Sequence, residues 1–130
     1  MSERRRYFKR PDQAITAIQF VLETEGFSYQ KWGAQQRCKQ GDWLVNNNGD
    51  IYTVDADTFT QTYQQVSDGK FVKTTPVWAE QTNSDGSIKT KEGESNYKAG
   101  DYLVFNNEDG SDGYCVSADK FLTMYQSDKP

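Results

Sequence analysis

The sequence predicts a predominantly β protein of the α+β class, made of two diverged copies of one unit of roughly sixty residues. Three observations predict it. Short motifs recur in the same order in both halves of the chain. Apolar runs are short and alternate with polar residues between turn-forming Gly and Asn residues, as in half-buried strands. Aromatic residues make up 14% of the chain, enough for a small packed core although only 35% of residues are hydrophobic.

The repeat is clearest around two Gly-Asp motifs. Gly41-Asp42-Trp43-Leu44-Val45 matches Gly100-Asp101-Tyr102-Leu103-Val104, with Lys39 and Lys98 two residues before them. The other matches, in chain order, are Phe8-Lys9 with Phe71 and Lys73, Ile15–Gln19 with Val77–Gln81, Tyr52–Val54 with Tyr114–Val116, Ala56-Asp57 with Ala118-Asp119, Phe59 with Phe121, and Tyr63 with Tyr125. We expect a flexible basic N-terminus at residues 1–6, a first repeat at 7–66 and a second at 71–126, packed as one compact pseudo-symmetric domain.

Each unit is predicted to begin with a strand and continue into a β-hairpin. Residues 14–21 alternate as a strand with both faces partly covered, and a Gly-, Gln- and Lys-rich connection follows it. Residues 43–45 then form the first strand of the hairpin. Asn47-Asn48-Gly49-Asp50 forms the turn, because Asn and Gly tolerate positive φ, and residues 51–54 form the returning strand.

A short helix is predicted to close each unit. Phe59 and Tyr63 stand one helical turn apart, and Phe121 and Tyr125 repeat this spacing. We expect Asp57 and Asp119 to cap these helices rather than to bind a ligand. A helix of about two turns does not persist alone, so each helix has to pack on its hairpin through its aromatic pair.

These motifs resemble a family of small, mostly uncharacterised proteins of bacteriophages, prophages and bacteria. Its members combine a Pro-Val-x-Ala-x-Gln-like strand, a Gly-Asp-Trp/Tyr motif, a glycine turn, a Tyr and a final Phe-x-x-x-Tyr. The second half matches through Pro76-Val77-Trp78-Ala79-Glu80-Gln81, whereas the first half has Ala14 in place of the proline. The chain also resembles, more loosely, the bacterial Pro-Gly-Asp-Tyr-Gly domain, although Ala99 precedes Gly100. The resemblance implies a phage or prophage setting and brings no catalytic residues.

Charge and composition argue against several classes of protein. The formal net charge is −4, and residues 1–10 carry five basic residues and one acidic residue, which leaves −8 on the remainder. An acidic body repels phosphate backbones, so we expect no nucleic-acid binding by the folded part. The apolar runs are far shorter than a membrane span, and no signal-peptide segment follows the basic start, so we expect a cytoplasmic protein without membrane contact. Cys38 and Cys115 are expected to be free thiols.

The sequence offers little for catalysis. It has no histidine, which removes the usual imidazole base and the Ser-His and Cys-His nucleophile pairs. The weak catalytic candidates are Asp42 and Asp101, which a two-fold repeat could bring together, although turn aspartates that accept backbone N–H bonds explain them better. The acidic turn at residues 108–113 lacks the spacing of a calcium loop. We therefore expect no metal and no cofactor.

Aromatic residues give the better functional lead. Those that a cleft between the repeats could use, with the paired lysines beside them, are Trp43, Tyr102, Lys39, Lys98, Trp32 and Trp78. Our first hypothesis is a non-enzymatic binding module, plausibly phage- or prophage-derived, that acts on a protein partner or a small ligand through the surface between its repeats. The second is sequestration of a nucleotide-like ligand by aromatic stacking. The third is a small carboxylate-dependent hydrolase or lyase.

Overall fold

A computed structural model describes residues 3–127 and confirms a predominantly β, α+β fold. The first half contains β1 (Arg5–Lys9), β2 (Ile15–Gln19), β3 (Phe27–Lys31), β4 (Ala34–Cys38), β5 (Trp43–Asn47), β6 (Asp50–Val54), α1 (Ala56–Thr62) and β7 (Tyr63–Ser67). The second half contains β8 (Lys70–Lys73), β9 (Val77–Gln81), β10 (Gly86–Lys89), β11 (Glu94–Tyr97), β12 (Tyr102–Phe105), β13 (Gly113–Val116), α2 (Ala118–Met124) and β14 (Tyr125–Ser127). Within the described residues, no helix has the length and apolar character needed to cross a membrane.

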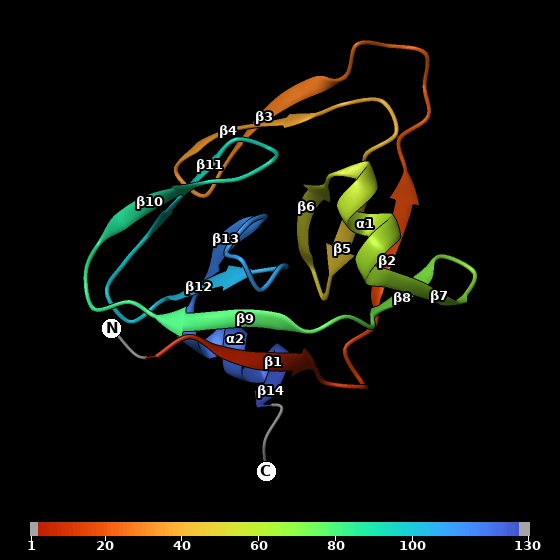
Figure 1. Cartoon of the computed structure of the whole chain (residues 1–130). Coiled ribbons are helices and arrows are strands. Elements are labelled where there is room, and N and C mark those ends of the chain that lie inside the picture. The colour runs from red at the N-terminus through yellow and green to blue at the C-terminus, as the bar shows by residue number, and fades with distance from the viewer. Residues whose placement is uncertain (1–2, 128–130) are drawn as a thin grey trace.

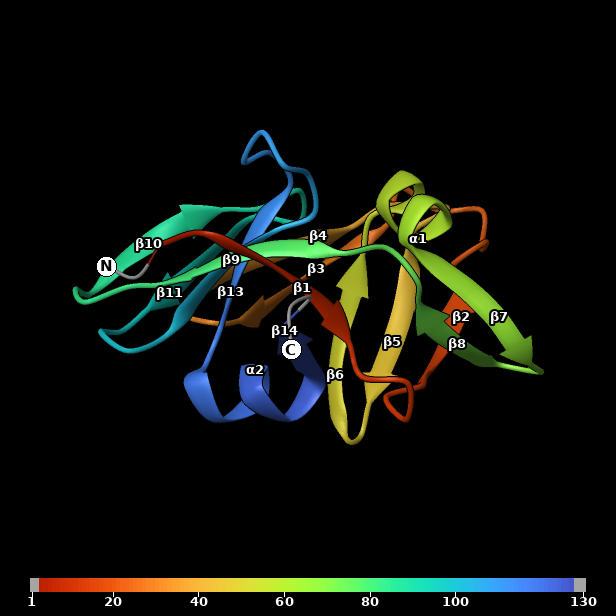
Figure 2. The ribbon, with the colours of Figure 1, turned by 60° about the horizontal axis from the view of Figure 1, so that its bottom comes forward.

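Two five-stranded antiparallel sheets form the body of the protein (Figure 1). Their strand orders are β6-β5-β2-β8-β7 and β13-β12-β9-β1-β14. The middle strand of each carries alternate buried apolar residues, Ile15 and Ala17 in β2 and Val77 and Ala79 in β9. This period of two is the pattern of a sheet with one face on a core. Figure 2 shows β9 and β1, neighbouring strands of one sheet, running across the molecule toward the strands of the other sheet.

The strand that opens each half lies in the sheet of the other half. β1 pairs with β9 and β14, while β8 pairs with β2 and β7. The registers correspond, since Lys9 lies opposite Tyr125 and Lys73 lies opposite Tyr63. The segment expected as a flexible N-terminus includes the first two residues of β1, and the side chain of Arg4 pairs with Glu80 at 2.5 Å. Each sheet is therefore completed by a strand from the other half, which ties the halves together.

Each sheet has its own aromatic core, centred on one phenylalanine of the adjacent helix. Phe59 of α1 stacks on Trp43, with ring centroids 4.2 Å apart, and on Tyr63 at 4.7 Å. Phe121 of α2 stacks on Tyr102 at 4.1 Å and on Tyr125 at 5.0 Å. Both phenylalanines are almost completely buried. The aromatic pairs therefore pack together as predicted, but Tyr63 and Tyr125 are the first residues of β7 and β14 and do not belong to the helices, as the sequence had suggested.

The N-caps of the helices are Asp55 and Ser117, so Asp57 and Asp119, which we expected as caps, lie in the first helical turns instead. Asp55 Oδ2 accepts hydrogen bonds from the backbone N–H groups of Asp57 and Thr58, at 3.1 and 3.3 Å. The hydroxyl of Ser117 makes no such bond. Only α1 therefore has a side-chain cap.

This difference makes Asp55 and Ser117 a matched pair of test positions. We expect Asp55→Ala to lower the free energy of unfolding by about 1–2 kcal/mol, because it leaves helical N–H groups unpaired. Ser117→Ala should change it by less than about 0.5 kcal/mol. Urea denaturation of both variants measures the difference. Equal losses at the two sites would contradict the assigned caps.

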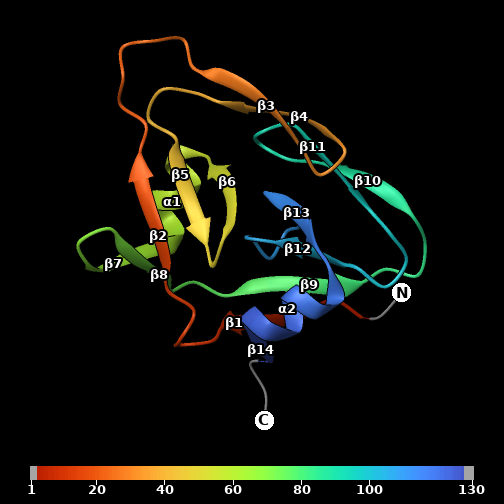
Figure 3. The same ribbon diagram turned by 180° about the vertical axis from the view of Figure 1, so that it is seen from behind.

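Two further hairpins, β3–β4 and β10–β11, extend from the body and meet each other (Figures 1 and 3). The backbone N–H of Arg37 donates to the Glu92 carbonyl at 2.6 Å, and that of Asn96 donates to the Trp32 carbonyl at 2.9 Å. Gln36, fully buried, donates to the Glu94 carbonyl at 2.5 Å. The region expected as a Gly- and Gln-rich connection is thus a second bridge between the halves.

Candidate functional site

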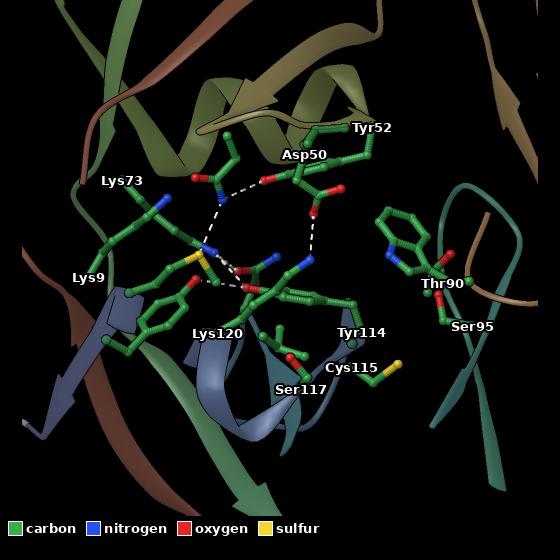
Figure 4. Close-up of a pocket in the computed structure, with 18 of the residues that line it drawn as sticks. Lys9, Asp50, Tyr52, Lys73, Thr90, Ser95, Tyr114, Cys115, Ser117 and Lys120 are labelled. Atoms are coloured by element: carbon green, nitrogen blue, oxygen red, sulfur yellow. Dashed lines mark hydrogen bonds and ion pairs between the residues drawn. The ribbon is translucent and has the colours of Figure 1, made fainter. Parts of the chain in front are cut away.

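A cavity of about 520 Å³ lies between the two halves, and we call it the seam cavity. β6 and α1 of the first half line it together with β13 and α2 of the second, and the two long hairpins contribute further residues. Figure 4 shows labelled side chains that line it from both halves: Lys9, Asp50, Tyr52, Lys73, Tyr114 and Lys120. Its volume lies within the range of about 300–1,000 Å³ that is typical of small-molecule sites.

Two buried lysines, from corresponding strands of the two sheets, lie at one end of the seam cavity (Figure 4). Lys9 of β1 is 8% exposed and Lys73 of β8 is 9% exposed. Lys73 Nζ donates to Asn106 Oδ1 at 2.6 Å and to the Tyr114 hydroxyl at 3.1 Å. Lys9 Nζ lies 5.6 Å from the centre of the Tyr63 ring and has no hydrogen-bond acceptor among the described residues. Both ammonium groups are thus held out of bulk water.

The environment of these lysines disfavours their positive charge. Burial lowers the pKa of Lys9 from 10.5 to about 8. Burial, together with the charge of Lys9, lowers the pKa of Lys73 to about 7, although the carboxylate of Asp112 acts weakly in the opposite direction. Among the described residues neither lysine forms an ion pair with a carboxylate. A buried charge without an opposite charge is costly, so an anion at this end of the cavity would stabilise both ammonium groups.

Four tyrosines surround the lysines, two from each half: Tyr52, Tyr63, Tyr114 and Tyr125. Their phenols are neutral, since burial raises the pKa of Tyr125 to about 12 and raises the pKa of the other three as well. The hydroxyls of Tyr114 and Tyr125 lie 3.1 Å apart, and Asn47 Nδ2 donates to the Tyr52 hydroxyl at 3.4 Å. Neutral phenols can donate hydrogen bonds to an anion.

Hydroxyl groups and an indole line the opposite end of the seam cavity. Thr90 and Ser95 lie there, away from the lysines, as Figure 4 shows. Trp32, in the turn between β3 and β4, also lines the cavity and packs on Tyr52 with ring centroids 5.7 Å apart. The exposed fraction of Trp32 is 36%, so a face or edge of the indole is free for contact.

Backbone strain coincides with this cavity. The described residues other than glycine with positive φ are Trp32, Asn48 and Asp112, at 56°, 55° and 56°, and all three line the seam cavity. Asn and Asp tolerate this conformation, but a large residue such as Trp adopts it only at a cost. Strained residues cluster at functional sites. Trp32 and the following Gly33 both have positive φ, as a two-residue hairpin turn requires, and this turn between β3 and β4 is what places the indole in the cavity.

The acidic residues of the cavity are held by other partners. Asp50 pairs with Lys31 at 2.8 Å and with Lys120 of α2 at 3.3 Å, which joins the two halves. Glu92 accepts a hydrogen bond from the backbone N–H of Asp55 at 2.8 Å, and burial raises its pKa to about 7. These carboxylates therefore do not neutralise the two buried lysines.

Among the binding residues predicted from the sequence, Trp32 lines the seam cavity. Trp43 and Tyr102 instead stack on the helix phenylalanines in the two cores. Trp78 is half-buried in β9, where it lies opposite Phe105 in the neighbouring strand. The structure therefore does not bring the predicted aromatic residues together in one cleft.

The paired lysines and aspartates that the sequence singled out take part in the turns before β5 and β12, where each aspartate accepts a hydrogen bond from the backbone N–H of its lysine. Asp42 is 1% exposed, and its oxygens accept from the backbone N–H groups of Lys39 and Ala56 at 2.9 and 3.1 Å. Lys39 Nζ pairs with the same carboxylate at 3.1 Å. Asp101 accepts from the backbone N–H of Lys98 at 2.9 Å, and it also lines the seam cavity. No contact between Asp42 and Asp101 is present among the described residues.

Hydrogen bonds within the protein use the carboxylates of the acidic turn at residues 108–113. In the turn, Asp109 accepts from Ser111, and Asp112 accepts from Thr58 at 2.8 Å and Asn106 at 3.0 Å. No group of three or more potential metal-ligating residues occurs among the described residues. Both cysteines are free; Cys115 lines the cavity, and burial raises its pKa to about 11, so it is a thiol rather than a reactive thiolate.

Sequence reasoning did not single out the buried lysines and tyrosines, although it paired Lys9 with Lys73, Tyr52 with Tyr114 and Tyr63 with Tyr125 as repeat positions. Paired positions were interpreted as scaffold, whereas these pairs meet in the seam cavity. The chemistry of the seam cavity is therefore inferred from these lysines and tyrosines. Comparisons of the chain with protein-family models, with curated proteins and with solved structures found no match.

Proposed function

We propose that this protein is a non-enzymatic binding protein that holds a small ligand in the seam cavity. The observation that carries the proposal is the cavity itself, about 520 Å³ in volume and lined by both halves. The buried ammonium groups of Lys9 and Lys73, which have no carboxylate in an ion pair among the described residues, support it, because a buried charge without an opposite charge is costly. Trp32 adds a partly exposed indole to the lining.

A small ligand suits this geometry better than a protein partner. The two lysines with lowered pKa values are more than nine-tenths buried and line a cavity whose volume is that of a small-molecule site. Sequestration of a nucleotide-like ligand, in which the cavity removes a compound from solution, is one form of this function. A phage or prophage setting, as the motif resemblance implies, agrees with such a role.

The two halves are proposed to descend from one duplicated unit that packs with pseudo-two-fold symmetry. The matching motifs and the corresponding strand orders of the two sheets support this origin. A duplication places equivalent residues on opposite sides of a seam, and it explains why lysines, tyrosines and asparagines line the cavity in pairs.

The test separates small molecules from proteins. A cell extract is divided by ultrafiltration, and each fraction is added to the wild-type protein and to Cys115→Trp, which places an indole inside the cavity. We expect the small-molecule fraction to raise the melting temperature of the wild type by mass action and to leave Cys115→Trp unchanged. A shift caused only by the protein fraction, or no shift with either, would contradict the proposal.

An enzyme is the second candidate, and Glu92 favours it more than Asp42 and Asp101 do. The pKa of Glu92, about 7, suits a general acid or base, and it lines the same cavity as the lysines. The ligand captured in the extract experiment distinguishes the two. Recovery of the compound unchanged after prolonged incubation supports binding alone, whereas its conversion by the wild type but not by Glu92→Gln would establish catalysis.

A further inference from the structure

We propose that the ligand of the seam cavity is a planar aromatic molecule with one anionic group, whose anion binds between Lys9 and Lys73 while its ring packs against Trp32. This inference rests on the proposed function and adds the chemical class of the ligand and its orientation. A phosphate and a carboxylate share the required anion chemistry.

The anionic group follows from the unmatched charge at the lysine end. Lys9 and Lys73 come from different sheets, yet they are close enough for the charge of one to lower the pKa of the other. Lys9 Nζ has no hydrogen-bond acceptor among the described residues, although its side chain is more than nine-tenths buried. Two ammonium groups that repel each other in a low-dielectric site form a receptor for a shared counter-ion.

The surrounding phenols complete this receptor. The hydroxyls of Tyr114 and Tyr125 lie 3.1 Å apart beside Lys73 Nζ, so one phenolic proton is free to turn toward an anion. Because burial keeps these phenols neutral, they donate hydrogen bonds without adding negative charge. Charge-assisted hydrogen bonds from ammonium and phenol groups are the strong class.

A planar ring at the other end follows from Trp32. Its indole is held in the cavity by a turn whose φ of 56° would suit glycine or asparagine better, and it faces Tyr52 at 5.7 Å between ring centroids. Aromatic pairs at 4.5–7 Å contribute about 0.5–1.5 kcal/mol beyond area burial. Thr90 and Ser95 add hydroxyl groups that can bind ring substituents.

The same end argues for a single anionic group. Glu92 lines the cavity and has a pKa of about 7, so at neutral pH it is partly ionised and disfavours a second anion beside it. Asp112 instead acts on the lysine end, because it accepts from Asn106, which also binds Lys73 Nζ, and its charge raises the pKa of Lys73. A ligand with negative charge at both ends would therefore meet repulsion at one of them.

Isothermal titration calorimetry at pH 7 with two matched pairs of probes tests this inference. AMP and adenosine form the phosphate pair, and indole-3-acetate and indole-3-acetamide form the carboxylate pair. The proteins are the wild type, Lys9→Met, Lys73→Met, Trp32→Gly and, as the control, Lys89→Met, which changes an exposed lysine outside the cavity.

We expect at least one anionic probe to bind the wild type more than tenfold tighter than its neutral partner. Each lysine variant should weaken that binding by about 10–100-fold and leave the neutral probe unchanged, as expected for loss of a charge-assisted hydrogen bond. Trp32→Gly should weaken both members of the pair, and Lys89→Met should match the wild type. The pair that responds identifies the anion as phosphate or carboxylate.

Two results would overturn the inference. Equal affinity for the charged and neutral members of each pair would show that the ligand needs no anionic group. The proposed small-molecule function would still stand. Failure of all four probes to bind would reject this ligand class. The extract experiment does not depend on the charge of the ligand, so the failure of the proposed function remains distinguishable.

Discussion

Phe121→Ala should lower the free energy of unfolding by about 3–5 kcal/mol, the range for removal of a large buried aromatic side chain. Phe121 has no exposed surface and stacks between Tyr102 and Tyr125, with Tyr7 of β1 packed edge-on at 4.9 Å. Truncation leaves a void among these rings and removes the contact that holds α2 on its sheet. Phe59→Ala should have a similar effect on α1, because Phe59 stacks between Trp43 and Tyr63.

The neighbour of Phe121 provides the control. Leu122 is 55% exposed on the same helix, so Leu122→Ala should change the free energy of unfolding by less than about 0.5 kcal/mol. Chemical denaturation of the three variants measures both effects. A small loss for Phe121→Ala, comparable to that of Leu122→Ala, would mean that the helix does not pack as described.

Lys9→Met should instead stabilise the ligand-free protein, by about 3 kcal/mol at pH 7. Burial lowers the pKa of Lys9 from 10.5 in the unfolded chain to about 8 in the folded protein, and each pKa unit corresponds to about 1.4 kcal/mol. Methionine fills a similar volume without a charge. Because Lys9 lacks a hydrogen-bond acceptor among the described residues, its replacement leaves no partner unsatisfied.

The pH dependence of this gain checks its cause. Between about pH 8 and 10.5 the unfolded chain binds a proton at Lys9 that the folded protein does not, so the wild type gains stability as the pH rises. The advantage of Lys9→Met is therefore full below pH 8 and disappears by about pH 10.5. Melting temperatures at pH 7 and 10 measure it. A variant that is less stable than the wild type at pH 7 would show that Lys9 is not held as an unpaired charge.

Local chemistry was sufficient to predict the two short helices and the β5–β6 and β12–β13 hairpins, but not the β3–β4 and β10–β11 hairpins. The spacing of Phe59 and Tyr63, repeated by Phe121 and Tyr125, stacks each helix phenylalanine on the tyrosine that begins the next strand, and both pairs pack in the cores. Asn48 adopts positive φ in the predicted hairpin turn, as its neighbour Gly49 does. Such features depend on residues that are close in the chain, so the sequence carries them directly.

Long-range pairing was not predictable in the same way. β1 precedes β2 in the chain but pairs with β9 and β14, and no local pattern in residues 5–9 indicates that exchange. Because of this exchange, Lys9 of the N-terminal strand lines the seam cavity at the same end as Lys73. Lys9 and Lys73 occupy matching positions in the two halves, and the sequence alone suggested a structural role for such positions. In the structure both lysines line the seam cavity and give the candidate site its positive charge.

The titration of Lys9 and Lys73, followed by carbon-13 NMR of the side-chain ε carbons, tests the central claim most directly. In the free protein we expect the pKa of Lys9 to be about 8 and that of Lys73 about 7. With saturating AMP or indole-3-acetate, whichever binds, both pKa values should rise toward 10.5, because a neighbouring anion favours the charged ammonium. Ligand-bound pKa values equal to those of the free protein would place the anion elsewhere and contradict the account of the seam cavity.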